Sequence, residues 1–139
     1  MDLTRTISLL HRKMNKELNN RLLTIGLSKA QSRLLKHIYR NGRMTQADLC
    51  KDLGLDKSTV AKALSRMESD GLITKQVNPE DSRTFFVYPT EKANQIIPKM
   101  RDVLSSWTKD VTVNLTEAEK ELFYSLLDKV TKEAVDICR

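Results

Sequence analysis

Six basic or hydroxyl side chains occupy positions between residues 57 and 66 that share one face of a predicted helix. They are Lys57, Ser58, Thr59, Lys62, Ser65 and Arg66. Lysine and arginine supply positive charge to phosphates, and arginine also pairs with guanine in the major groove. Small hydroxyl residues at a helix start let phosphates approach the N-terminus, which the helix dipole makes attractive to anions. The pattern indicates a nucleic-acid surface, although a merely solvated helix face would use the same residues.

A second charged feature is the segment Pro79-Glu80-Asp81-Ser82-Arg83, which lies between two runs typical of strands. An arginine on a protruding hairpin can enter a narrow minor groove, where the negative potential of DNA is strongest. Arg83 is the candidate for that contact. We expect Asp81, two residues earlier, to orient the guanidinium or hold the loop shape rather than to contact DNA.

The elements that must position these side chains form a helix-turn-helix. Thr45 is the expected cap of a short helix that ends at Gly54, and Asp56 is the expected cap of a second helix that stops before Gly71. The second helix has apolar residues at i, i+4 and i+7, and these predict its buried face: Val60, Leu64 and Met67. Two short helices joined by a tight turn are the helix-turn-helix motif.

Two predicted strands follow, at 72–77 and 84–88, with the charged segment as the loop between them. A helix-turn-helix followed by a two-stranded hairpin is a winged helix. A capping box at Ser28 and Gln31 predicts one more helix before it, up to about Tyr39. The expected fold class is therefore mainly α, with a two-stranded β-wing and long N- and C-terminal helices.

The long flanking helices are predicted at 3–25, 90–111 and 116–137, and each carries an apolar stripe. Pro98 lies inside the second of these, so we expect a kink or a local break there. A helix of 22 residues extends about 33 Å, further than a small winged helix can cover. The surplus apolar surface predicts a two-fold homodimer. The expected dimerisation residues are Leu3, Ile7, Leu10, Trp107, Leu122, Leu126 and Val130.

Residues 52–73, "DLGLDKSTVAKALSRMESDGLI", and 78–90, "NPEDSRTFFVYPT", resemble the multiple antibiotic resistance regulator (MarR) family of bacterial transcription factors. The wing pattern D-x-R-x-x-x-V-x-L-T is matched at Asp81, Arg83, Val87 and Thr90, with Pro89 in place of the usual leucine. The resemblance implies a homodimeric repressor or activator on a pseudo-palindromic operator. It also implies control by a small aromatic effector or by thiol oxidation, and no effector at all is another outcome that the family allows.

Composition limits the other functions. The net charge is +6, with the basic excess in the first two thirds of the chain. No window is apolar enough to span a bilayer and no secretory signal is evident, so we expect a cytoplasmic protein. Cys50 and Cys138 have no metal-like spacing, and Cys50 is expected to be a structural thiol. We expect no metal, no cofactor and no enzymatic activity, and only ordinary surface or interface roles for His11 and His37.

The expected organisation is a single domain over 1–139. Its DNA-binding part is 28–90 and its dimerisation helices are 1–25 and 91–139. The expected function is sequence-specific DNA binding and regulation, with repression of nearby genes favoured. Two alternatives stay open, namely a winged helix used only for protein interaction and a sequence-tolerant architectural DNA binder.

Overall fold

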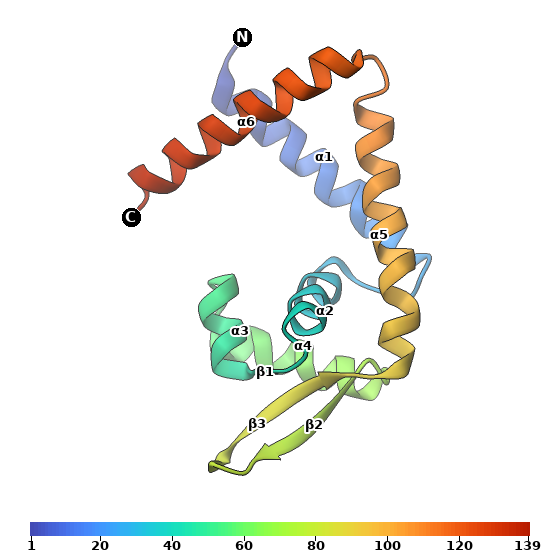
Figure 1. The fold of residues 1–139 in the computed structure, drawn as a ribbon, viewed down its shortest axis with the longest axis vertical. Coiled ribbons are helices and arrows are strands. Elements are labelled where there is room, and N and C mark those ends of the chain that lie inside the picture. Colours follow the sequence, from blue (N-terminus) through green and yellow to red (C-terminus); the bar gives the residue numbers. More distant parts are fainter. The chain divides into compact units, whose positions relative to one another are not determined.

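The order of elements in the computed structural model, which describes all 139 residues, is that of a winged helix with long flanking helices (Figure 1). The elements are α1 (Leu3–Leu23), α2 (Lys29–Asn41), β1 (Met44–Thr45), α3 (Gln46–Leu53), α4 (Lys57–Ser69), β2 (Ile73–Asn78), β3 (Asp81–Pro89), α5 (Glu91–Val111) and α6 (Glu117–Ile137). The mainly α fold class is confirmed. The chain divides into two compact units, Met1–Leu104 and Ser105–Arg139.

Side-chain caps fix where the helices begin. The capping box expected at Ser28 is present, another capping box begins α6 at Thr116, and the Thr45 side chain accepts a hydrogen bond from the Asp48 backbone. Each cap satisfies backbone N–H groups that have no partner within the helix. These local signals explain why the helix starts were predictable to within a residue or two.

The hydrophobic core of the first unit lies between the helix-turn-helix, α2 and the sheet. Leu34, Leu35 and Ile38 of α2 are buried. They pack in one cluster with the apolar face of α4, namely Val60, Leu64 and Met67. Burial of these three α4 residues turns the opposite face of the helix toward solvent. The core therefore sets the orientation of the polar face of α4.

The sheet has three antiparallel strands in the order β1-β3-β2, one more than the sequence predicts. The added strand β1 has only two residues, pairing Met44 with Val87 and Thr45 with Phe86, and is too short to give an alternating pattern. The hairpin is also longer than expected, because β3 begins at Asp81 instead of Thr84. As a result Arg83 lies on a strand and not in a loop.

Helix α5 is one continuous α-helix through Pro98, so the expected local break does not occur. Proline removes one backbone donor, but Ala93, Ile97 and Met100 on the same helix are buried and hold both sides of that position against the core. Tertiary packing outweighs the local cost.

The predicted dimerisation stripes are exposed in the single chain. In the first unit Leu3, Ile7 and Leu10 of α1 are each about half exposed or more, whereas Leu18 and Leu22 of the same helix are buried. In the second unit α6 has 21 residues and none of them is buried. None of the helices combines the length and the apolar character that crossing a membrane requires.

Candidate nucleic-acid interface

Helix α4 begins at a cap that uses both oxygens of one carboxylate. Asp56 Oδ2 accepts a hydrogen bond from the Thr59 backbone N–H at 3.1 Å, and Oδ1 accepts one from the Thr59 hydroxyl at 2.5 Å. These bonds from Thr59, first from its side chain and then from its backbone, lower the pKa of Asp56 below the ordinary value of 3.8. The cap holds the first turn of α4 and the hydroxyl of Thr59 in place.

The structure puts all six predicted α4 residues on the exposed side of the helix. Two further contacts attach α4 to its neighbours. The side-chain amide of Gln46 in α3 donates to the Lys57 carbonyl at 3.2 Å. Lys75 Nζ of β2 forms a salt bridge with Glu68 Oε1 of α4 at 3.7 Å. The polar face is therefore presented on a helix that is tied to both the preceding helix and the hairpin.

The hairpin β2–β3 turns at Pro79 and Glu80. Asn78 Oδ1 accepts from the Glu80 backbone N–H at 3.0 Å, which closes the turn with a side chain. The strand register shifts between Val77 and Asn78, and Thr84 Oγ1 donates to the Asp81 carbonyl at 3.1 Å just beyond the turn. The tip therefore has a defined shape before any partner binds.

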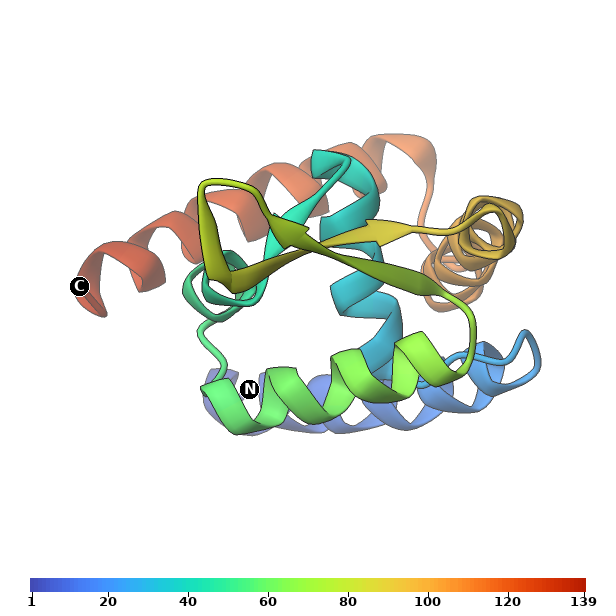
Figure 2. The same ribbon diagram turned by 90° about the horizontal axis from the view of Figure 1, so that it is seen from below.

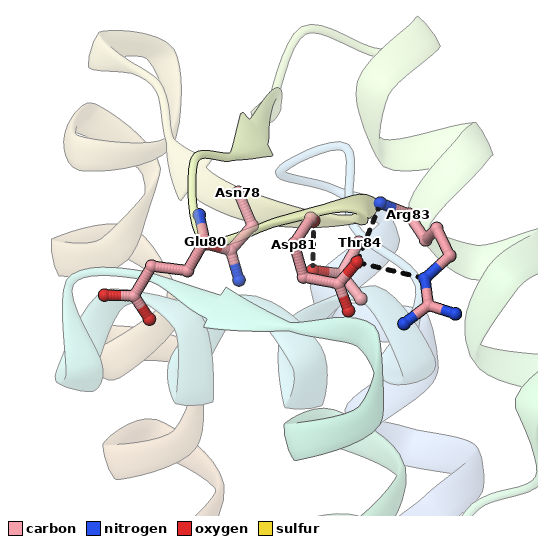
Figure 3. Close-up of polar contacts among 5 residues, drawn as sticks. All are labelled: Asn78, Glu80, Asp81, Arg83 and Thr84. Atoms are coloured by element: carbon pink, nitrogen blue, oxygen red, sulfur yellow. Dashed lines mark hydrogen bonds and ion pairs between the residues drawn. The ribbon is translucent and has the colours of Figure 1, made fainter.

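Arg83 projects from this tip, and Asp81 holds its base (Figure 3). Asp81 Oδ1 accepts from Arg83 Nε at 3.2 Å and from the Arg83 backbone N–H at 3.1 Å. The Arg83 side-chain bond, followed by the backbone bond, lowers the pKa of Asp81. The Arg83 side chain is 89% exposed, so the terminal guanidinium nitrogens remain available to a partner. The Asp81 carboxylate thus restrains the base of the Arg83 side chain, and its role as a brace during DNA binding stays a prediction.

A cleft of about 960 Å³ separates the hairpin from the helix-turn-helix. Four cationic residues line it: Lys51, Lys57, Lys75 and Arg83. Lys51 and Lys75 are not among the residues predicted from the sequence. The alternation of the strand at 72–77 places Lys75 on the same face as the buried Ile73, and that face looks toward the helices. Cys50 is half-buried on the same wall, packed against the core, and Cys138 is exposed.

Helix α4 and the hairpin lie on the same face of the first unit, which Figure 2 shows turned toward the viewer. The helix that carries the exposed basic residues and the hairpin that carries Arg83 thus lie on one side of the first unit. Lys57 from the first sequence feature and Arg83 from the second line one cleft. His11 and His37 do not belong to it: His11 Nε2 is 3.0 Å from Asn15 Nδ2 on α1, and His37 lies on α2 with a buried Nδ1 that has no hydrogen-bond partner.

Comparison with known proteins agrees with this geometry. The sequence profile of the MarR family matches residues 25–84. The HTH-type transcriptional regulator BilQ of Clostridioides difficile is 31% identical over 104 residues, which cover 73% of this chain and 70% of that protein. The HTH-type transcriptional regulator YybA of Bacillus subtilis is 28% identical over 131 residues, which cover 94% of this chain and 87% of that protein.

Solved structures agree in fold over nearly the whole chain. A crystal structure of MarR superposes with a TM-score of 0.85 at 28% identity, covering 99% of this chain and 93% of that one. A mutant MarR from E. coli complexed with operator DNA superposes with a TM-score of 0.79 at 28% identity, covering 92% of each chain.

The fold and the exposed cationic face define a winged helix-turn-helix protein. Its sequence and structure then place it in one group of such proteins. The chain belongs to the MarR family and is a transcriptional regulator of that family.

Proposed function

We propose that the chain acts as a homodimeric, sequence-specific repressor of nearby genes that binds a pseudo-palindromic operator. The observation that carries the proposal is the pairing of an exposed cationic α4 face with a braced, 89% exposed Arg83 on the same side of the first unit. The operator complex of the MarR mutant from E. coli supports it, because that protein shares this fold.

The proposed contacts divide into two kinds. Lys57, Ser58 and Thr59 meet phosphates at the N-terminus of α4, where backbone N–H groups and the helix dipole favour anions. The remaining α4 residues reach base edges in the major groove: Lys62, Ser65 and Arg66. Arg83 enters the adjacent minor groove while Asp81 keeps it oriented. The DNA-binding part in this proposal is 28–90.

The proposed dimer covers the apolar surfaces that the single chain leaves open. Helix α6 exposes Leu122, Leu126 and Val130, and α1 exposes Leu3, Ile7 and Leu10. Large exposed apolar faces mark protein interaction sites, and an isologous pairing covers the same face on both copies. Trp107 is half-buried on α5 and is proposed to contribute to this interface. Segments 1–25 and 91–139 are the dimerisation helices in this proposal, within one domain of 1–139.

Relief of repression by a small aromatic effector is the remaining part of the proposal, and it rests on the family resemblance. His11, Arg12, His37 and Tyr39 are the side chains proposed to lie nearest such a ligand. Titration of phenolic and aromatic acids into a preformed protein–DNA complex tests it, with release of the DNA as the expected result. Unchanged binding across the series would contradict the effector part alone.

A mobility-shift assay on the intergenic DNA beside the gene tests the main proposal. We expect one discrete complex that resists excess unrelated DNA and contains two copies of the chain. Equal competition by unrelated DNA would favour an architectural binder. No retention on any duplex, or on heparin at moderate salt, would favour a protein-interaction module.

A further inference from the structure

The C-terminal end of α4 is attached to α2 by one buried glutamine. Gln31 is 6% exposed and its Nε2 donates to Asp70 Oδ2 at 2.9 Å. Asp70 is the residue that caps the end of α4, and its own backbone N–H donates to the Arg66 carbonyl at 2.9 Å. The glutamine therefore holds the last turn of the helix, next to a residue proposed to read DNA.

The other end of the Gln31 amide is also occupied. Its Oε1 accepts from the Ser28 backbone N–H at 3.0 Å, and the Ser28 hydroxyl accepts from the Gln31 backbone N–H at 3.1 Å. Since Ser28 N–H can only donate, Oε1 must face it and the NH₂ group must face Asp70. The amide has one orientation, fixed by the cap of α2, and cannot turn away from α4 without losing that cap.

Asp70 is held from a second helix as well. Its carbonyl accepts from Lys92 Nζ of α5 at 2.6 Å, and the neighbouring Gly71 carbonyl accepts from Thr90 Oγ1 at 2.6 Å. These bonds reach the backbone after α4, whereas Gln31 alone among these groups contacts the Asp70 side chain. The Gln31–Asp70 bond is thus a separate restraint, and substitution of Gln31 leaves the α5 contacts in place.

The length of α4 means that a small rotation of the helix moves its C-terminal end far enough to affect DNA contacts. A helix of 13 residues is about 20 Å long, so a rotation of about 10° about its N-terminus moves its C-terminus by about 3 Å. That displacement exceeds the tolerance of a hydrogen bond to a base edge. Phosphate contacts by flexible lysines tolerate it better, because a lysine ammonium acts as a point charge on a long stem.

We infer that Gln31 is a positioning residue for sequence readout, which sets the direction of α4 in the major groove through Asp70. The inference rests on the proposed DNA-binding function. Loss of the restraint should lower affinity for the operator more than affinity for unrelated DNA. A residue that served stability alone would lower both equally, in proportion to the unfolded fraction.

Three variants test the inference. Gln31→Glu keeps an oxygen for the Ser28 cap but removes the donor and sets a carboxylate against Asp70. Asp70→Asn is the matched control, because its side-chain oxygen still accepts from Gln31. The double variant Gln31→Glu/Asp70→Asn restores the bond with reversed direction, from the new amide to the new carboxylate.

Two measurements are made on each variant. The first is the ratio of dissociation constants for the operator and for an unrelated duplex of equal length at one salt concentration. We expect Gln31→Glu to lose about tenfold in this ratio, which is the scale of one hydrogen bond to a charged group. We expect Asp70→Asn to resemble the parent and the double variant to recover. The second is hydrogen exchange without DNA, which should quicken at 66–72 in Gln31→Glu only.

The opposite results would overturn the inference. These are an unchanged ratio in Gln31→Glu, no recovery in the double variant, or exchange that quickens uniformly over all helices. A parent chain that binds both duplexes equally would contradict the proposed function, and would be seen before any variant is compared. The exchange measurement would then show separately whether the restraint on α4 exists.

Discussion

Asp81 and Arg83 lie two residues apart on β3, and one carboxylate oxygen of Asp81 accepts from both the backbone N–H and Nε of Arg83. The two bonds, at 3.1 and 3.2 Å, restrain both the backbone of Arg83 and the Nε atom of its guanidinium. The positive charge of Arg83 is therefore oriented before a partner binds. Such preorganisation reduces the ordering cost of binding.

Replacement of Arg83 should remove the proposed contact with the minor groove. We expect Arg83→Ala to weaken operator binding by about 1–3 kcal/mol, the scale of one specific arginine contact. Arg83→Lys should recover only part of the loss, because lysine lacks the planar fork. Titration at fixed salt measures both, with light scattering to verify the oligomeric state. Equal affinity of Arg83→Ala and parent would refute the wing assignment.

The basic residues of α4 should determine the salt dependence of binding. Each neutralised phosphate contributes a slope of about −0.9 to log affinity against log salt. We expect Lys57→Gln to reduce the slope by about one such contact and to weaken all duplexes alike. Lys129→Gln on α6 is the matched control, since it removes the same charge outside the proposed DNA-binding part, and light scattering verifies that the variant is still dimeric. Identical slopes for Lys57→Gln and the control would count against the α4 surface.

Acid should weaken the cap of α4. The pKa of Asp56 is lowered in the folded chain, so its carboxylate adds stability that is fully present above the ordinary value of 3.8 and lost as pH falls through the lowered folded pKa. We expect the free energy of unfolding of the parent to exceed that of Asp56→Asn by a constant margin from pH 5 to 8. The two should converge only in acid below that ordinary pKa. Denaturant titrations at each pH measure the margin, and a margin that grows in acid would contradict the cap.

A charge placed on the apolar face of α6 should separate the proposed dimer. Leu126 is 50% exposed in the single chain and is expected to be covered by the second copy. Leu126→Glu should therefore give monomers in sedimentation experiments and lose operator binding. Ser125→Glu is the matched control, because it adds the same charge at an exposed polar position of the same helix. A dimeric Leu126→Glu variant would remove α6 from the interface.

Much of the fold was predictable because local signals and burial agree. The caps at Ser28, Thr45 and Thr116 and the buried apolar face of α4 follow from residue types at fixed spacing. The features that the sequence did not predict depend on tertiary contacts. Strand β1 exists only because β3 pairs with it, and Pro98 stays helical because Ala93, Ile97 and Met100 are packed.

The candidate site could likewise be proposed from the sequence only where local patterns point to it, and not where tertiary contacts create it. The six α4 residues and Arg83 could be identified from spacing and charge. Strand alternation indicates the face on which Lys75 lies, but only the folded hairpin brings Lys75 and Lys51 to one cleft. The Gln31–Asp70 bond spans 39 positions in the sequence, so no local pattern could reveal it.

Footprinting of the operator complex by hydroxyl radicals tests the central claim most directly. Two copies that each present α4 and Arg83 should protect two half-sites about one helical turn apart, or roughly 34 Å, with protected minor-groove positions flanking them. Arg83→Ala should lose the flanking protection and keep the two central regions. A single continuous protected stretch, or a footprint that Arg83→Ala leaves unaltered, would contradict the account.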